Sequence, residues 1–413
     1  MLRIWNVAVA LILALPLAAA AEAPQNGAAP SPTAPEPAAP PPPSPAPTPA
    51  VPPQALEPGA QLPAAPGPAA PDGTLPPAGP PPWGALEILG EQVPPGETRE
   101  LALRSSESFA GAGVDMPVVV MRGDKPGPTL CLTAGVHGDE LNGIEIVREI
   151  LDTTRARGLS GTILAVPIVN IHGFQTSSRY LPDRRDLNRA FPGHAVGSSA
   201  SRIAHALFQN VIRRCDALID LHTGSFHRSN LPQVRSDLQD ERVLKLAKAF
   251  GATVIIHNKG QRGTLRRAAH EAGIPSIIYE AGEPMRFERQ EIKRGVIGVR
   301  NVLVHLGMVK GGRVSLGDPR IFYETRWVRA ERGGILVSDV RLGDTVREGD
   351  ILGSITDPIR KEKSVLISPF RGRIIGMTLA PVMLPGYAAF HIGVPGSKPI
   401  DSEEPLEYDD RPE

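Results

Sequence analysis

Three patterns of hydrophobic and polar positions follow one another along this chain. Between residues 84 and 311, short apolar runs typical of buried strands alternate with longer segments whose apolar residues recur at helical spacing. After residue 311 only short apolar runs remain, separated by Gly-Asp and Pro turns. Residues 24–83 show neither pattern. The chain is therefore predicted to contain an α/β part, a smaller all-β part and a segment without a packed core.

The α/β part, residues 84–311, is predicted to form a mixed, mostly parallel sheet with helices on both faces, because strands and helices alternate along it. Pro167 lies within one predicted strand and indicates a bulge or an earlier end of that strand. The predicted strands are 86–88, 98–103, 117–121, 129–134, 162–170, 217–221, 253–257 and 276–280, and the predicted helices are 141–157, 201–214, 240–250, 264–272 and 288–306.

Residues 312–398 are predicted to form a small, separate all-β module, because their apolar runs are short and turn residues separate them. The acidic tail, residues 399–413, is expected to fray. The predicted strands of the module are 323–328, 334–337, 346–355, 364–368 and 372–377.

The N-terminal segment predicts export. Residues 1–23 combine a basic residue, an apolar run and small residues around a candidate cleavage site, as secretory signal peptides do. The apolar run is short for a spanning helix, which favours a periplasmic or secreted product cleaved near residues 20–23 over a retained membrane anchor. Residues 24–83 are dominated by Pro and Ala, and we predict a disordered, extended linker there.

Composition narrows the choice of partners. The 44 Lys and Arg residues balance 44 Asp and Glu residues, so nothing indicates a nucleic-acid partner or a basic membrane-binding face. Membrane contact is expected only if the signal segment is retained, and the oligomeric state is open. Cys131 and Cys215 each open an apolar run, and packing as reduced thiols and a single disulfide remain alternatives.

Candidate metal ligands lie at the ends of predicted strands. His137 and Glu140 follow the buried run 129–134, and His222 ends a later strand in the same way. Open α/β sheets place their active sites at these carboxyl ends. Two imidazoles and a carboxylate can hold one zinc ion and leave a position open for water. Asp220 shares a strand face with His222, where it either hydrogen-bonds a ligand imidazole or is satisfied by backbone donors.

Metal-assisted hydrolysis also needs a proton acceptor and a means of binding substrate. Glu280 lies at the end of another predicted strand and is the candidate general base, whereas its competitor Glu283 lies beyond the following turn. The Arg-rich loop between the ligand strands contains further candidates. Arg179 can stabilise the developing oxyanion, and Asn188 with Arg189 can bind a substrate carboxylate through several donors.

These motifs, taken in order, resemble the succinylglutamate desuccinylase/aspartoacylase family, a branch of the zinc carboxypeptidase superfamily. Two further segments, Arg122-Gly-Asp-Lys-Pro-Gly-Pro128 and Gly263-Thr-Leu265, resemble the subgroup of N-acetyl-diaminobutyrate deacetylase-like proteins. The family motifs are His137-Gly-Asp-Glu140, Arg179, Asp186-Leu-Asn188-Arg189, Asp220-Leu-His222-Thr and Glu280.

The resemblance implies a zinc carboxypeptidase-like fold and one zinc ion held by His137, Glu140 and His222. It also implies Glu280 as general base and acid, Arg179 as the group polarising the scissile carbonyl, and Asn188 with Arg189 binding a free carboxylate. Characterised members of the family are mostly cytoplasmic, so the predicted export and the Pro-rich linker depart from the family pattern.

The C-terminal module has its own resemblance. The segments 343–353 and 368–372 resemble the barrel-sandwich hammerhead of biotinyl and lipoyl domains. The region between them, 357–363, lacks the usual acceptor sequence around a carrier lysine. We therefore expect a structural cap that shapes the cleft rather than a carrier domain.

Three functions compete. The leading hypothesis is an exported zinc amidohydrolase that removes the acyl group from an N-acylated amino acid or a related small amide with a free carboxylate. A zinc carboxypeptidase or amidase acting on cell-wall peptides is the second, because export and the carboxylate-binding residues suit it equally. The third is a zinc-dependent binding protein without turnover, against which the presence of Glu280 argues.

Overall fold

The computed structural model describes residues 83–107 and 113–396. These residues all belong to one compact unit, Leu75–Glu413. The predicted signal segment, nearly all of the Pro/Ala-rich linker and the acidic tail lie outside the described residues, so their predictions are not addressed by the structure.

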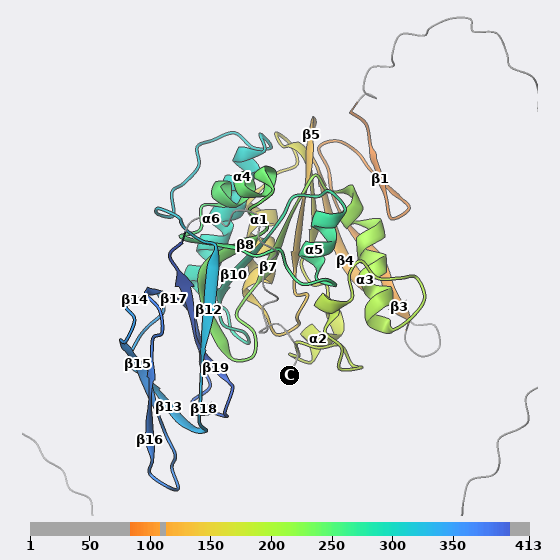
Figure 1. Ribbon diagram of the computed structural model, residues 1–413. Helices are drawn as coiled ribbons and strands as arrows, with labels where there is room; N and C mark the ends of the chain where they lie inside the picture. The colour runs from red at the N-terminus through yellow and green to blue at the C-terminus, as the bar shows by residue number, and fades with distance from the viewer. Residues whose placement is uncertain (1–82, 108–112, 397–413) are drawn as a thin grey trace, which may run out of the picture. The chain divides into compact units, whose positions relative to one another are not determined.

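A mixed sheet runs through the α/β part (Figure 1). Its central strands β6, β5, β7 and β10 are parallel neighbours, and antiparallel strands flank them on both sides. In spatial order the strands are β3 (Thr98–Glu107), β4 (Gly113–Arg122), β6 (Ser160–Val166), β5 (Lys125–Ala134), β7 (Ala217–His222), β10 (Ser276–Gly282), β8 (Arg228–Ser236), β9 (Val254–His257) and β11 (Arg320–Phe322). A separate hairpin pairs β1 (Leu86–Ile88) with β2 (Glu91–Val93).

Helices cover both faces of this sheet, as predicted (Figure 1). On one face α1 (Asn142–Thr153), α4 (Glu241–Phe250) and α6 (Arg289–His305) bury one apolar cluster against the strands. On the other face α3 (Ser199–Asn210) and α5 (Leu265–Glu271) bury a second cluster. The parallel strands are therefore apolar on both faces, which explains their continuous apolar runs.

Local signals explain where the helices begin and end. Ser198, Asp240 and Thr264 each accept a hydrogen bond from a backbone N–H in the first turn of α3, α4 and α5. Such caps satisfy donors that the helix itself leaves unpaired. Gly251 ends α4 with a φ of 85°, a conformation that glycine adopts without steric cost.

The five predicted helices are all present, with ends shifted by up to four residues. The strand predicted at 162–170 ends at Val166, before Pro167, because proline cannot donate to a central ladder. Several strands were not predicted, and the longest of them is β8, which lies between β10 and β9 and carries the polar sequence Arg228–Ser236.

The C-terminal strands form two antiparallel groups around a third apolar cluster. The first group joins the main sheet, because β17 pairs with β8 through Gly376 and Asn230. The predicted strand 346–355 is wrong in one respect, since a turn divides it into β14 and β15. The likeness to a barrel-sandwich hammerhead stays a prediction. The first group is β12 (Glu324–Arg329), β19 (Ala388–Val394), β17 (Gly372–Thr378) and β14 (Thr345–Val346), and the second is β16 (Lys363–Ile367), β15 (Ile351–Thr356), β13 (Gly334–Ser338) and β18 (Val382–Met383).

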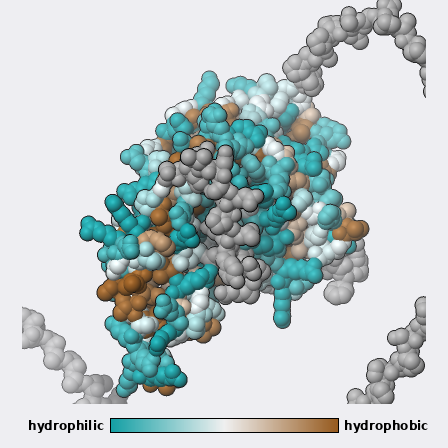
Figure 2. Space-filling view, in the orientation of Figure 1, coloured by the Kyte–Doolittle hydropathy of each residue, from teal (hydrophilic) through white to brown (hydrophobic). Residues whose placement is uncertain are grey.

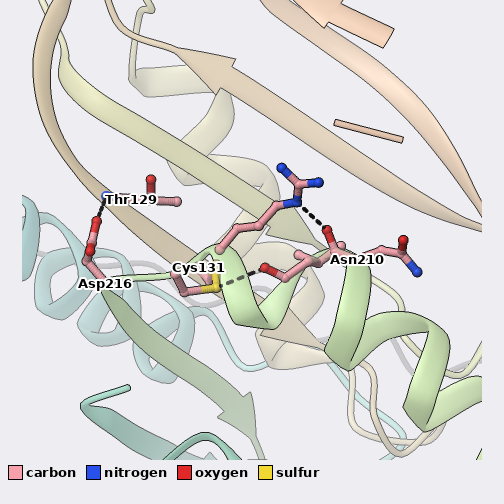
Figure 3. The surroundings of a disulfide bond; sticks show 7 residues. Thr129, Cys131, Asn210 and Asp216 are labelled. Atoms are coloured by element: carbon pink, nitrogen blue, oxygen red, sulfur yellow. Dashed lines mark hydrogen bonds between the residues drawn. A yellow bond between two sulfur atoms is a disulfide. The ribbon is translucent and has the colours of Figure 1, made fainter. Parts of the chain in front are cut away.

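Cys131 and Cys215 form a disulfide that closes an 84-residue separation, which decides between the two alternatives left open by the sequence. Both cysteines are buried within the second apolar cluster. Beside them the Asp216 carboxylate accepts a 2.7 Å hydrogen bond from the Thr129 backbone, which ties β5 to the residue that precedes β7 (Figure 3).

Among the described residues, no helix is both long enough and apolar enough to cross a membrane.

Candidate metal centre

The loop after β5 presents His137 and Glu140. Gly135 turns the chain away from the sheet with a φ of 58°, and α1 begins at Asn142. A side chain at Gly138 would place its Cβ 1.9 Å from the Gly173 carbonyl carbon. The loop can pack this closely on the helix α2 (Ile171–Gln175) only because residue 138 is glycine.

His137, Glu140 and His222 form a buried group that could hold a metal ion, with one candidate ligand atom from each within 4.8 Å of the others. The Glu140 carboxylate lies between the two imidazoles. Its Oε1 is 2.8 Å from His137 Nδ1, and its Oε2 is 2.7 Å from His222 Nδ1. All three residues are at most 5% exposed. Two imidazole nitrogens and a carboxylate thus converge on one position, as the sequence predicts.

Each imidazole is held from behind by an aspartate. Asp220 Oδ2 lies 2.9 Å from His222 Nε2, and Asp186 Oδ1 lies 3.2 Å from His137 Nε2. An ionised carboxylate only accepts hydrogen bonds, so it favours the tautomer in which Nε2 carries the proton. The Nδ1 lone pair then points toward the shared position. Carboxylate support of this kind fixes the ring and increases its basicity as a metal ligand.

The side chains around this position carry a net negative charge, which favours the binding of a cation. Glu140, Asp186 and Asp220 are three carboxylates, and Arg179 is one compensating cation, which leaves an excess of two negative charges when both imidazoles are neutral. Burial lowers the pKa of His222, but the carboxylates of Asp220 and Glu140 outweigh it and raise that pKa well above its ordinary value. A divalent cation matches this donor set and this charge.

Arg179 contacts the same group from the loop between the ligand strands. Its Nη1 donates to Glu140 Oε1 at 3.2 Å, and its Nη2 donates to Asp186 Oδ2 at 2.9 Å. The side chain is 9% exposed, and its guanidinium carbon lies 4.8 Å from the centre of the Phe226 ring. Burial lowers the pKa of Arg179, but the facing carboxylates raise it above its ordinary value, so the guanidinium stays charged.

Glu280 lies beside the metal candidates and lines the same pocket. It is directly opposite His222 in the register of β10 and β7, so both side chains are on one face of the sheet. Asn230 Nδ2 donates to Glu280 Oε2 at 2.7 Å, and Arg235 Nε lies 3.5 Å from the same oxygen. Its competitor Glu283 forms an ion pair with Arg286 and does not line this pocket.

Asn188 and Arg189 also line the pocket, but one polar group of each side chain is hydrogen-bonded within the protein. Asn188 Oδ1 accepts a 2.8 Å hydrogen bond from the backbone of Leu265, the first residue of α5. The amide Nδ2 of Asn188 is thus its donor for a ligand. Arg189 Nη1 donates to the Asn188 carbonyl oxygen at 2.8 Å, and its Nε is buried without a partner in the described structure.

The C-terminal strands contribute a wall of the pocket through Trp327 on β12. The indole stacks on His391 of β19 with 4.4 Å between ring centres and an interplanar angle of 5°. The guanidinium of Arg228 lies 4.8 Å from the indole on this wall. Burial lowers the pKa of His391 well below its ordinary value, and the charges of Arg235 and Arg228 act in the same direction.

Seven of the eight predicted site residues therefore line one pocket, and the eighth, Asp220, lies behind His222. Sequence reasoning missed several neighbours. Asp186 lies within a quoted motif, and a search for carboxylates that could support His137 would have identified it. Asn230, Arg235 and Trp327 carry no comparable signal, because two lie on the unpredicted strand β8 and the third comes from the C-terminal strands.

Comparisons with known proteins agree on one family. A model of the succinylglutamate desuccinylase/aspartoacylase catalytic domain matches residues 126–306. An N-alpha-acetyl-L-2,4-diaminobutyric acid deacetylase from Halomonas elongata is 30% identical over 273 residues, covering 63% of this chain and 79% of that protein. A solved succinylglutamate desuccinylase/aspartoacylase from Rhodobacter sphaeroides is 25% identical with a TM-score of 0.67, covering 73% of this chain and 96% of that one.

A product-bound structure of the ectoine utilization protein EutE (DoeB) from Ruegeria pomeroyi has the same identity, 25%, and the same TM-score, 0.67. It covers 72% of this chain and 95% of that one. The mixed α/β fold with helices on both faces is the fold of these relatives. The chain belongs to the succinylglutamate desuccinylase/aspartoacylase family.

Proposed function

We propose that this chain is an exported zinc-dependent amidohydrolase that removes the acyl group from an N-acylated amino acid or a similar small amide with a free carboxylate. The observation that carries the proposal is the buried group of His137, Glu140 and His222, with an aspartate behind each imidazole. The similar protein from Halomonas elongata supports the same class of reaction, because its name describes a deacetylase of an N-acetylated amino acid.

Zinc fits the ligands better than the other common divalent ions. Magnesium and calcium prefer oxygen ligands, whereas zinc combines imidazole and carboxylate ligands and keeps one position open in catalytic sites. Zinc held by His137, Glu140 and His222 would act as a Lewis acid toward the scissile carbonyl and activate water for attack.

Glu280 is the proton acceptor in this proposal. The contacts of Asn230 and Arg235 both fall on Oε2, and within the described residues no hydrogen bond engages Oε1. Oε1 can therefore take the proton from the attacking water. The same carboxyl can pass that proton to the leaving amine, which converts a poor leaving group into a neutral one.

Three side chains bind and polarise the substrate in this proposal. Arg179 places a buried positive charge beside the Glu140 ligand, where negative charge develops on the attacked carbonyl oxygen. Arg189 and the Nδ2 amide of Asn188 supply donors for the free carboxylate. A charge-assisted contact at each end of the substrate would align the amide between them.

Export is supported by two independent features. Residues 1–23 have the pattern of a signal peptide. The buried Cys131–Cys215 disulfide suits an oxidising compartment, where such bonds form and persist. Fractionation of cells followed by N-terminal sequencing tests this part: a periplasmic or secreted chain starting near residue 24 is expected, and a cytoplasmic chain that keeps residues 1–23 would contradict it.

The reaction is tested with the purified, zinc-loaded chain and a panel of N-acetyl and N-succinyl amino acids. We expect equimolar release of amine and carboxylic acid from at least one member, loss of release after chelation and recovery on adding zinc. The His137→Ala variant should release no amine from any substrate of the panel, because it lacks a metal ligand. A zinc-loaded, folded chain that cleaves none of the amides would overturn the proposal.

A further inference from the structure

The outer face of the small sheet β16-β15-β13-β18 carries a patch of branched aliphatic side chains. The inner face packs into the third apolar cluster through residues such as Leu336, Leu352 and Leu366. Six residues of the outer face are β-branched aliphatic residues that are between 43% and 63% exposed. We call these six residues the aliphatic face: Ile335, Val337, Ile351, Val365, Ile367 and Val382.

The strand register shows that the aliphatic face is continuous. Ile335 is directly opposite Val382, and Ile351 is directly opposite Ile367. Between these pairs, Val337 and Val365 flank the small side chain of Ser354 on the intervening strand. Residues directly opposite each other in a sheet point to the same side. The six side chains therefore share one surface that spans all four strands.

Such a face departs from what a solvated sheet shows. Antiparallel sheets with one face in water normally alternate apolar residues inside with polar residues outside. Here β13 is apolar on both sides, and β16 places Val365 and Ile367 outside beside Lys363, with Leu366 inside. Figure 2 shows apolar surface gathered over β13 and β15. Single exposed aliphatic residues are ordinary, but a contiguous patch of this kind is typical of an interaction site.

Positive and negative residues around the aliphatic face nearly balance, which favours a partner whose contacting surface is uncharged. Between residues 331 and 384 there are eight Lys or Arg residues and seven Asp or Glu residues. A near balance of this kind gives no attraction to an anionic polymer or an anionic lipid surface. The aliphatic face is also close to flat and made of β-branched residues, and two such faces pack well as a β-sandwich about 10 Å apart.

We propose that the aliphatic face is a homodimer interface, on which a second copy of this chain packs its own aliphatic face about a two-fold axis. A two-fold axis brings the same patch of each copy together, so one apolar surface supplies both halves of the contact. If each half-exposed side chain offers about 90 Å², two faces bury roughly 1,100 Å², near the lower limit for specific interfaces. Leu384, which is 51% exposed two residues after Val382, would add to this area.

The test is the mass of the full chain in solution, measured by light scattering during gel filtration and by sedimentation. Wild type is expected at twice the mass of one chain at micromolar concentration. Val337→Lys combined with Val365→Lys is expected to be monomeric, because it buries like charges at the centre of the interface. Val196→Lys is the matched control: Val196 is 81% exposed and lies outside the aliphatic face, so this variant is expected to remain dimeric.

A second variant guards against misfolding of the lysine variant. Val337→Thr with Val365→Thr keeps the β-branched shape and is expected to weaken dimerisation at least tenfold while the circular dichroism spectrum stays unchanged. A wild-type chain that is monomeric at about 100 µM protein would overturn the proposal. So would a lysine variant that remains dimeric, because the contact would then lie elsewhere.

Discussion

Replacing Asp220 with asparagine should weaken zinc binding without removing a ligand. Asp220 is fully buried. Its Oδ2 is 2.9 Å from His222 Nε2, and its Oδ1 accepts a 2.7 Å hydrogen bond from the Thr133 hydroxyl. Asparagine has nearly the same shape, and the Thr133 hydroxyl can rotate to accept from the new amide. The substitution therefore removes one negative charge and leaves the hydrogen-bonding geometry almost intact.

The expected loss follows from what the carboxylate does for the imidazole. Asp220 favours the tautomer that leaves Nδ1 of His222 free to bind metal, and its charge increases the basicity of that ring. Loss of such a supporting group typically lowers metal affinity by a factor of about 10 to 100. That factor corresponds to about 1.4 to 2.7 kcal/mol of binding free energy.

The assay is competition for zinc between the purified apo chain and a chromophoric chelator of known affinity. Asp216→Asn is the matched control, because Asp216 also accepts a 2.7 Å hydrogen bond but does so from Thr129 beside the disulfide. We expect wild-type affinity in the control and a 10- to 100-fold loss in Asp220→Asn. An affinity within twofold of wild type in a folded Asp220→Asn chain would refute the role assigned to this carboxylate.

Three further predictions concern activity and stability. Glu280→Gln should lower kcat by about 10² to 10⁴ while one zinc per chain remains bound, as shown by metal analysis beside the rate assay; an unchanged kcat would remove Glu280 from the chemistry. The Cys131→Ala, Cys215→Ala double variant should lose roughly 2 to 5 kcal/mol of unfolding free energy in urea titrations, and a loss below 1 kcal/mol would contradict a structural role for the bond. Because burial holds the pKa of His391 well below its ordinary value near 6.5, the unfolded chain binds more protons at acidic pH, so this histidine lowers stability as pH falls below about 6.5. His391→Phe, which keeps the stack on the neighbouring indole, should therefore lose less stability than wild type between pH 7 and pH 5 in thermal melts, and identical pH profiles would count against this reasoning.

The helices and the apolar strands could be predicted because their signals are local. Apolar residues at helical spacing and capping residues such as Ser198 and Asp240 lie within the segments they organise. The metal candidates could be predicted for a related reason. His137 and His222 each follow an apolar run, and parallel strands bring their carboxyl ends to one edge of the sheet.

The strand β8 could not be predicted because polar residues that contact the pocket break its apolar alternation. Asn230, Gln233 and Arg235 interrupt the apolar alternation, and Pro232 weakens it further. Asn230 and Arg235 contact Glu280 in the pocket, and both are polar where a strand pattern requires apolar residues. The pairing of β17 with β8 is equally hidden, since it joins residues more than 140 positions apart and depends on the close approach of Gly376.

Zinc titration of the metal-free chain tests the central claim most directly, with amide hydrolysis of the best panel substrate as the readout. The group of His137, Glu140 and His222 is one site. Activity should therefore be absent without metal, rise linearly with added zinc and reach its plateau at one equivalent per chain. Full activity in a chain shown by metal analysis to contain no zinc, or no activity at any zinc level with every panel substrate, would contradict a single catalytic metal at these residues.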